Sequence, residues 1–508
     1  MVISTAKNTT ANNLQVLENS LFGRRDIFAS VAEITPANVI DEVNSALVFH
    51  LQNLMEEDYL YWYRRGVTPV LNRKKKYNKH VLNKVSVAVA EQIIDFKNGY
   101  FMTEPCFYVA RNNAAQSKID QLNEYLYRSG KQQADNKLVD WFHTVGKAAL
   151  FVEPNDDDEV PYKAYAVDPR SAFVVYSLKP GNRPVMGINL VISGNKMLVD
   201  AYTEDSVYKL EGSFNGRSTT AYPDFETLST SIIDIQPNVL GKIPIIEYRY
   251  NSVNMAAFEQ VLPLIDAVAK LQSDRLDGVD QFIQSLLVIY NAEMPDGETA
   301  ESVKEMGMIL LKSQGENKAD IKILSEQLNQ DQTQNFLNSI YEEIYSICAM
   351  PRVGEGSTYD TTGAAVMASQ GWFQADAAAR NCSDLFRESN RYFDEIVLEI
   401  LRRKGLLDVE TTDFDLHFIR NESAGIQSKA QAFNTLLASG LHPELAASKS
   451  GVSNDPVGDM KRSEKYLRMI WGDPSEADKA EEKTDGKGEA EVIEEDNANG
   501  EDATGGAV

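Results

Sequence analysis

The segment between residues 328 and 404 constrains the fold of this 508-residue chain most. Its first part has apolar side chains at helical spacing, which predicts a helix with one apolar face: Leu328, Phe336, Leu337, Ile340, Ile344 and Ile347. Pro351 interrupts this pattern, because proline does not continue a helix. Residues 351–363 (PRVGEGSTYDTTG) then have the glycine, serine and threonine content of a mobile loop.

A second, longer helical pattern begins at Ala364 and continues to Lys404, where Gly405 is expected to end it. Gly371 interrupts the pattern, so we expect a kink near Trp372. At about 1.5 Å per residue this helix would be about 60 Å long, more than the diameter of a small domain. A helix of this length needs a large partner, and other copies of the same chain are the most economical choice.

The chain is acidic, with a net charge of −25. Residues 473–508 contain thirteen acidic residues and three lysines, a net charge of −10, and almost no large apolar side chains. Such a segment buries too little to offset its ordering entropy, so we expect a disordered tail. The net charge of −15 on the rest of the chain argues against ordinary DNA binding, because such binding needs lysine and arginine side chains that contact the DNA phosphates.

The length of the chain predicts three or four structural modules. No apolar run is long enough to span a membrane, and the N-terminus lacks the pattern of a secretion signal. Cys106, Cys348 and Cys382 lie far apart in apolar surroundings, which indicates buried free thiols in a reducing compartment. We therefore expect a cytoplasmic protein without a membrane span.

Helical patterns dominate the first 150 residues. Residues 1–30 read as a loose polar arm, and Pro36–Tyr63 and Val81–Lys97 as amphipathic helices. Residues 116–150 predict two further helices. From Glu153 to Tyr250 the period changes to two, which predicts an antiparallel meander with a hairpin at Gly194-Asn195.

Helix is expected again over residues 258–290, followed by shorter elements to residue 326 that include two strand-like runs, MILLKS and DIKILS. After the segment of residues 328–404, DFDLHFIR (413–420) predicts a strand, and small helices are expected between Ser428 and Trp471.

Catalytic, cofactor and zinc signatures are absent from the sequence, and its five histidines are scattered: His50, His80, His143, His417 and His442. The run Asp156–Glu159 could bind a divalent cation, although a solvated loop is the better interpretation. Gly354–Gly363 could cradle a phosphate but lacks the lysine and the preceding strand of such sites, which favours a hinge loop. No catalytic residue, metal or cofactor is therefore assigned.

One basic cluster stands out in this acidic chain, and aromatic residues are interleaved with it. Contact with nucleic acid and pairing with acidic surface on a neighbouring subunit both remain open. Its members are Arg64, Arg65, Arg73, Lys74, Lys75, Lys76 and Lys79.

Four segments together resemble the portal proteins of tailed bacteriophages, in particular those of long-tailed phages of Gram-positive hosts. Individually the patterns are weak, and their order and spacing carry the resemblance. They are Tyr61–Val109, Gly241–Asp274 (GKIPIIEYRYN and FEQVLPLIDAVAKLQSD), Ile340–Asn381 and Phe414–Leu437.

The resemblance implies an α+β, predominantly helical portal-type fold, with long stem helices, a long kinked helix and an antiparallel β meander in the wing, assembled as a ring. Its parts map onto the chain as follows: arm 1–29, wing 30–257, stem helix 258–291, clip 292–328, stem helix 329–350, tunnel loop 351–363, long kinked helix 364–404, crown 405–472 and tail 473–508.

The resemblance also implies a function: a ring of twelve subunits at one capsid vertex of the virion, assembled in the host cytoplasm, through which double-stranded DNA is packaged and ejected. The partners would be terminase, head-completion or adaptor proteins, and the major capsid and scaffolding proteins. The channel would be lined by Arg352, Val353, Gly354, Glu355, Gly356, Ser357, Thr358, Tyr359, Asp360, Thr361 and Thr362, with hinges at Gly363 and Gly371 and clip contacts at Glu298, Glu301 and Lys304.

Because few cations would hold the phosphates, an acidic wall would let DNA slide without sequence reading. The alternatives are a metal-dependent nuclease and a coiled-coil scaffold or adaptor protein. Ring-shaped particles would distinguish a portal from both.

Overall fold

A computed structural model of the chain forms two compact units, Met1–Ser423 and Ala424–Val508, which are described separately. Within them, the structure describes residues 23–75, 81–111, 116–193, 196–214, 228–283, 286–290, 292–293, 312–313, 320–324, 330–351, 371–419, 426–453, 458–460, 462–463 and 466. The acidic tail of residues 473–508 lies outside these ranges.

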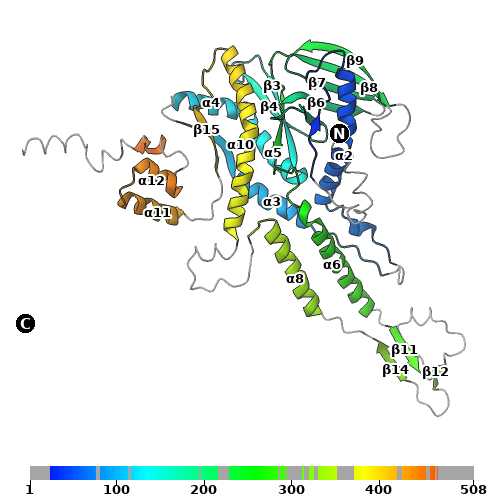
Figure 1. Cartoon of the computed structure of the whole chain (residues 1–508). Helices are drawn as coiled ribbons and strands as arrows, with labels where there is room; N and C mark the ends of the chain where they lie inside the picture. The colour runs from blue at the N-terminus through cyan, green and yellow to red at the C-terminus, as the bar shows by residue number, and fades with distance from the viewer. Residues whose placement is uncertain are drawn as a thin grey trace, which may run out of the picture. The chain divides into compact units, whose positions relative to one another are not determined.

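The first unit contains a six-stranded sheet with the order β1-β5-β6-β7-β8-β9 (Figure 1). Its strands are β1 (Ile27–Phe28), β5 (Ala172–Tyr176), β6 (Pro184–Ser193), β7 (Lys196–Tyr202), β8 (Ser206–Phe214) and β9 (Leu228–Pro237). Helix α2 (Val39–Arg64) packs Val43 and Leu47 against one face of this sheet. The predicted meander and its hairpin are confirmed, since Ser193 pairs with Lys196 across the two intervening residues.

The strand β10 (Ile245–Arg249) leaves the predicted meander and joins a second sheet of order β10-β3-β4, with β3 (Lys147–Pro154) and β4 (Tyr162–Val167). The expectation of helix up to residue 150 is therefore wrong. Gly146 ends the preceding helix with a φ of 95°, and a Cβ there would lie 2.1 Å from the Asn254 carbonyl oxygen. Only glycine fits this turn into β3.

Helix α5 (Lys131–Val145) packs against the three strands of this second sheet, and α3 (Val89–Phe101) and α4 (Gln116–Arg128) pack against α5. The helix predicted over Val81–Lys97 begins later, at Val89. The residues before it are extended because their backbone is held from outside, with Asn83 N donating to Asp277 at 2.7 Å and Val85 N to Ser273 at 2.9 Å.

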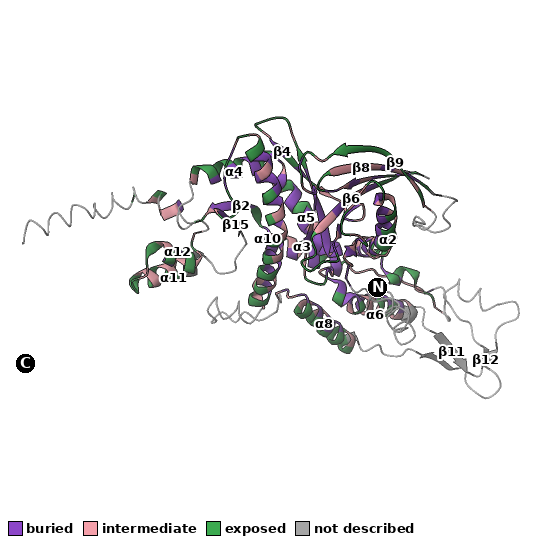
Figure 2. Ribbon diagram, turned by 45° about the horizontal axis from the view of Figure 1, so that its top comes forward, coloured by how far each residue is buried: buried purple, intermediate pink, exposed green. Residues whose placement is uncertain are grey.

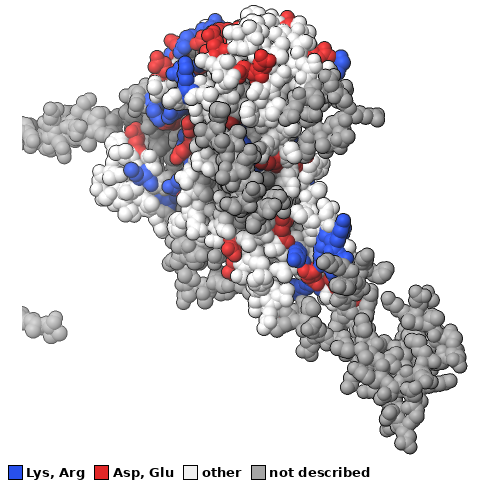
Figure 3. Space-filling model, turned by 45° about the vertical axis from the view of Figure 1, so that its right-hand side comes forward, with Lys and Arg blue, Asp and Glu red and all other residues white. Residues whose placement is uncertain are grey.

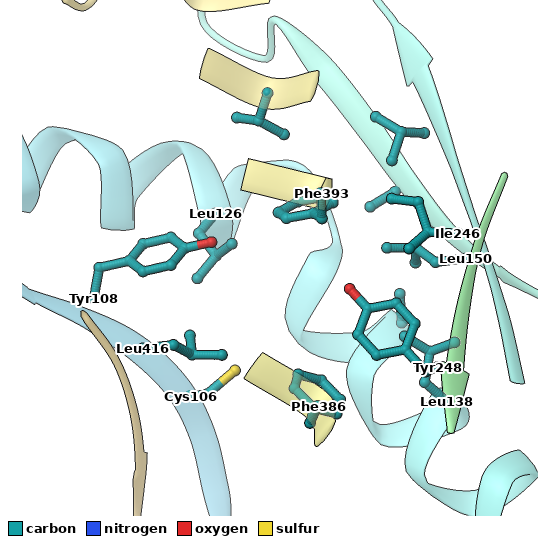
Figure 4. Close-up of a cluster of buried hydrophobic side chains, with 14 of the residues drawn as sticks. Cys106, Tyr108, Leu126, Leu138, Leu150, Ile246, Tyr248, Phe386, Phe393 and Leu416 are labelled. Carbon is teal, nitrogen blue, oxygen red and sulfur yellow. The ribbon is translucent and has the colours of Figure 1, made fainter. Parts of the chain in front are cut away.

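The largest apolar core is formed where α10 (Trp372–Arg403) packs against β3, β10, α4 and α5 (Figure 4). Phe386 and Phe393 of α10 lie in it beside Leu150 and Tyr248. All three cysteines are free and buried, as predicted. The predicted strand is β15 (Phe414–Ile419), which pairs with β2 (Glu104–Ala110).

Two helices, α6 (Leu262–Ile283) and α8 (Gln330–Ile347), lie side by side (Figures 1 and 2). A short 3-10 turn, η4 (Glu259–Val261), precedes α6. The prediction of one helix to Tyr290 is wrong, because Leu286–Tyr290 forms β11 and pairs antiparallel with β14 (Asp320–Leu324). This run, LLVIY, is rich in strand-forming residues, and a distant partner satisfies its backbone. The strands β12 (Ala292–Glu293) and β13 (Lys312–Ser313) form a further pair.

The start of the chain is anchored more firmly than the expected loose arm. Arg24 is 2% exposed and pairs with Glu259, with 2.8 Å between its Nη2 and Oε1. Its Nε also lies 3.2 Å from Glu56 Oε2. Residues 23–29, which the prediction placed in the arm, therefore belong to the folded body.

The second unit contains α11 (Ile426–Ala438) and α12 (Pro443–Ser450). Pro443 opens α12 and Gly451 closes it with a φ of 64°, a common arrangement at helix ends. The boundary expected at Gly405 falls inside the first unit because β15 pairs with β2 there.

Candidate channel and assembly elements

Most of the predicted site residues lie outside the described ranges. This holds for the tunnel-loop residues Arg352–Thr362, for the hinge at Gly363, and for the clip residues Glu298, Glu301 and Lys304. The structure does describe the elements that flank both segments. These flanking elements set where the loop and the clip leave the body.

The two ends of the loop segment lie next to each other. A Cβ built on Gly371 would be 3.8 Å from the carbonyl oxygen of Met350. The chain thus leaves the body after α8 and returns to the same place before α10. The sequence alone did not reveal that Met350 and Gly371 meet.

Gly371 is a helix boundary rather than a kink inside a continuous helix. Its φ is 83°, and α10 begins directly after it at Trp372. The left-handed conformation cannot be part of an α-helix, so the described helix is 32 residues long. Residues 364–370, where the longer helix was expected to start, lie outside the described part of the chain.

Aromatic packing fixes the start of α10. The Trp372 ring lies 6.2 Å from that of Phe96 and 5.9 Å from that of Tyr100, both on α3. The other end of the loop is set by Ala349, whose φ of 51° is rare for a residue with a side chain. Glycine is usual at this position. The helix α8 ends at Ile347, a few residues before the end that Pro351 predicts.

The α6–α8 pair is buried on one face only. Leu337, Ile340 and Ile344 of α8 pack with Ile265 and Val268 of α6. Apolar side chains also remain on the outer surface of both helices, where Figure 2 shows exposed residues along the pair. They are Leu276 (42% exposed), Val279 (40%) and Phe336 (57%), whereas Ile347 (45%) lines a groove together with residues of α10.

The α8 helix carries acidic residues and no lysine or arginine. Its charged side chains are Asp331, Glu342 and Glu343. The described part of α6 is different, because three of its carboxylates face a basic segment of the same chain. This segment comprises residues 73–75 and 81–85 and is called the basic strap below.

Asp277 of α6 binds the basic strap and is only 2% exposed. Its Oδ2 lies 2.9 Å from Arg73 and 2.6 Å from Lys75. Arg73 also pairs with Asp274, and Asn83 donates to Asp280. Although burial raises it, contact with Lys75 and Asn83 holds the pKa of Asp277 below its ordinary value.

Of the five described members of the predicted basic cluster, Arg64, Arg73 and Lys75 pair with carboxylates of the same chain. Arg64 pairs with Glu91 at 2.6 Å and with Asp140 at 2.7 Å, and Arg65 stacks on the Tyr61 ring at 3.7 Å. An open groove of about 910 Å³ beside them is lined by both signs of charge. Basic and acidic side chains are interspersed on the visible surface (Figure 3). Lys76 and Lys79 lie outside the described residues.

The acidic run Asp156–Glu159 lies in an exposed loop, where Asp158 pairs with Lys404 and Glu159 with Arg128. Among the residues with described positions, no group of three His, Cys, Asp or Glu side chains could hold a metal ion. Of the helices described here, none is long and apolar enough to cross a membrane.

A comparison with known protein families shows to which family the chain belongs. The family described as phage portal protein, SPP1 Gp6-like, matches residues 50–473. The chain belongs to this portal family. The portal protein of Bacillus phage SPP1 is 22% identical over 446 residues, which cover 84% of this chain and 83% of that protein. The resemblance stated from the sequence is confirmed at the level of the family.

Membership of the portal family implies a structural protein of a phage capsid, and not a member of an enzyme family. The matched residues include α6, α8 and α10 and both flanks of the loop segment. The mixed helix and sheet content, with an antiparallel sheet, agrees with the predicted α+β class.

Proposed function

We propose that twelve copies of this chain form a ring at one capsid vertex, and that double-stranded DNA is packaged and ejected through its channel. The α6–α8 pair carries this proposal, because Leu276, Val279 and Phe336 remain exposed on it. Neighbouring pairs in a ring would cover these side chains. The phage would be a long-tailed one with a Gram-positive host, a proposal that the similarity to the portal protein of Bacillus phage SPP1 supports.

The charge of α8 supports its role as channel wall. A wall without lysine or arginine offers few sites for the DNA phosphates, so the duplex slides with little binding energy to overcome at each step. The internal pairing of Arg64, Arg73 and Lys75 supports the same view, since these cations already have acidic partners.

The loop Arg352–Gly363 would line the narrowest part of the channel, with Gly371 as its C-terminal hinge. The meeting of Met350 and Gly371 supports this assignment, because a segment anchored at one point can move without disturbing α8 or α10. Arg352 is the only cation among Arg352–Gly363, beside Glu355 and Asp360, so contact with DNA would be mainly steric.

The clip, residues 292–328, would bind terminase during packaging and head-completion or adaptor proteins later. Its support is its place in the chain, since β11 and β14 follow α6 and precede α8. Residues 405–472 would form the crown, and the wing of residues 30–257 would face the major capsid and scaffolding proteins. Assembly would take place in the host cytoplasm.

Negative-stain microscopy and light scattering of the purified chain test the proposal. The expected result is one species of about twelve subunits with a central opening wide enough for a duplex. A monomer at micromolar concentration under all salt conditions would contradict it. Charge reversal at Glu298, Glu301 and Lys304 should then reduce terminase stimulation or adaptor binding while rings still form.

Neither alternative function gains support from the described residues. A nuclease needs a cluster of metal ligands, and the acidic loop at Asp156–Glu159 instead forms ion pairs with Lys404 and Arg128. A coiled-coil scaffold would not need the two sheets that make up the body.

A further inference from the structure

A small internal cavity lies between α2 and the sheets, away from the α6–α8 pair and the loop. Its volume of about 10 Å³ corresponds to one water-sized probe sphere. Residues from α2, β3, β5 and β10 line it, including His50, Glu57, Lys147, Phe173 and Glu247. His50 is 1% exposed and Glu57 2% exposed, so bulk water does not solvate either side chain.

Two buried polar atoms on this lining have no hydrogen-bond partner among the described residues: His50 Nδ1 and Glu57 Oε2. Leaving such atoms unpaired costs about 1–3 kcal/mol each, so native proteins rarely tolerate them. Both belong to α2, and their residues line the same cavity. A single group placed in this cavity could therefore serve both unpaired atoms.

The remaining polar groups of the lining are already engaged. Lys147 Nζ binds Asp26 at 2.7 Å and Glu247 at 3.3 Å. Glu247 accepts further hydrogen bonds from Tyr176 and from the backbone of Val174. The side-chain amide of Asn53 is also paired, because its Oδ1 accepts from the backbone N–H of Arg25 and its Nδ2 donates to the Arg25 carbonyl oxygen.

The hydrogen-bonding roles of the two unpaired atoms are complementary. His50 Nε2 lies 3.0 Å from the Arg170 carbonyl oxygen, which only accepts, so Nε2 carries the proton and Nδ1 is an acceptor. Burial lowers the pKa of His50 to about 4, which keeps the ring neutral. Burial also raises the pKa of Glu57 to about 8, so the carboxyl group carries a proton at neutral pH and donates.

We propose that a single buried water molecule occupies this cavity and bridges His50 Nδ1 and Glu57 Oε2. The water accepts from the Glu57 carboxyl group and donates to the imidazole. A metal cation does not fit, because it would need several oxygen ligands, whereas the raised pKa of Glu57 keeps its carboxyl group protonated and Glu247 already binds the ammonium group of Lys147. The water links His50 and Glu57, which both belong to α2. His50 also attaches α2 to β5, because its ring stacks on that of Phe173 with 4.1 Å between the ring centroids.

A structure of the assembled protein at about 2 Å resolution tests this site. The expected result is one density peak within hydrogen-bond distance of both atoms, retained in Glu57→Gln, whose amide still donates, and lost in Glu57→Leu. His50→Phe keeps the stacking on Phe173 but removes both the acceptor and the Nε2 hydrogen bond to the Arg170 carbonyl oxygen, so its readout is the loss of the density peak and not the melting temperature.

Three results would overturn the proposal. The first is a dry cavity in the native protein. The second is a peak with short contacts together with a melting temperature that depends on Na⁺ or K⁺, which indicates a bound cation. The third is a direct contact between Nδ1 and Oε2 that leaves no room for water. If His50→Phe fails to fold, the comparison of Glu57→Gln with Glu57→Leu decides between these outcomes.

Discussion

Arg24 illustrates how single buried charges hold distant parts of this chain together. Its guanidinium group is enclosed by the body and contacts Glu56 of α2 and Glu259 of η4. Glu259 in turn accepts from the backbone of Gly23 at 3.1 Å and Ala256 at 2.7 Å. The start of the folded body, α2 and the entry to α6 are therefore held together by two ion pairs of one buried arginine.

Arg24→Met should destabilise the protein by about 3–5 kcal/mol, because it leaves Glu259 buried without a charged partner. Urea unfolding followed by fluorescence measures the change. The matched control is Arg402→Met, since the Arg402 side chain is half exposed and its pair with Glu399 is worth about 0–1 kcal/mol. Equal effects of the two substitutions would show that the buried pair has no special role.

Glu57 predicts a pH dependence of stability. Its pKa in the folded protein, about 8, lies above the ordinary 4.5, so the folded state holds the proton more tightly. Its stabilising contribution is complete at low pH and is lost as the pH rises through 8, by up to about 1.4 kcal/mol per pH unit. Melting temperatures of Glu57→Gln should therefore fall less steeply between pH 6.5 and 8.5.

This pH window also separates Glu57 from His50. The pKa of His50 is lowered from 6.5 to about 4, so its titration affects stability below pH 6.5. Asp394, with a pKa raised to about 7 by burial, titrates in both proteins and cancels in the comparison. Identical slopes for the variant and the native protein would mean that Glu57 is ionised in the folded state.

Among the elements, the basic strap shows how α6 is connected to the body. Asp277→Asn removes the carboxylate charge that pairs with Arg73 and Lys75. Trypsin should then cleave the strap at least about tenfold faster, as expected when opening becomes easier by 1.4 kcal/mol or more. Asp274→Asn is the control, because Asp274 is half exposed and pairs with Arg73 alone. A cleavage rate unchanged by Asp277→Asn would contradict this role.

Gly371→Ala tests the hinge at the start of α10. The φ of 83° makes alanine unfavourable there by about 1–2 kcal/mol, but the nearest atoms, at 3.8 Å, leave space for the methyl group. We expect modest destabilisation with assembly intact and slower DNA packaging. Gly146→Ala is the contrast, because its Cβ would collide with the Asn254 backbone and prevent correct folding. Normal packaging by Gly371→Ala would exclude a hinge at this position.

The elements that the sequence predicted correctly are those whose pattern is decided locally. The stripe on α2 and the alternation of β6 and β7 follow from their own residues. Errors occurred where distant contacts decide the conformation. Side chains of α6 keep residues 81–85 extended, and β14 converts Leu286–Tyr290 from helix to strand. Buried charge pairs such as Arg24 with Glu259 are separated by 235 positions, which no local pattern reveals.

At the scale of the whole molecule, α10 packs inside the largest apolar core, while large apolar side chains remain exposed both on the body and on the α6–α8 pair. On the pair they lie on two helices that pack against each other, which is the arrangement that the proposed ring would extend to neighbouring copies. For the candidate site, the sequence therefore predicted the protein family and the presence of the two helices. It did not predict the exposed face, because the sequence does not tell which side of α8 meets α6.

Phe336→Asp tests this surface directly. If neighbouring copies cover Phe336, the aspartate becomes buried without a partner and weakens association at least about tenfold per contact. In a closed ring that loss recurs at every interface, so rings should disappear from negative-stain images and light scattering should give the mass of one chain. The control is Tyr127→Asp on α4, which changes an aromatic residue of similar exposure, 65% against 57%, away from the pair. The melting temperature of the dissociated Phe336→Asp chain should stay within a few degrees of the control's, because the substitution touches no buried contact within one copy. Rings that persist in Phe336→Asp would place the interface on another surface of the chain.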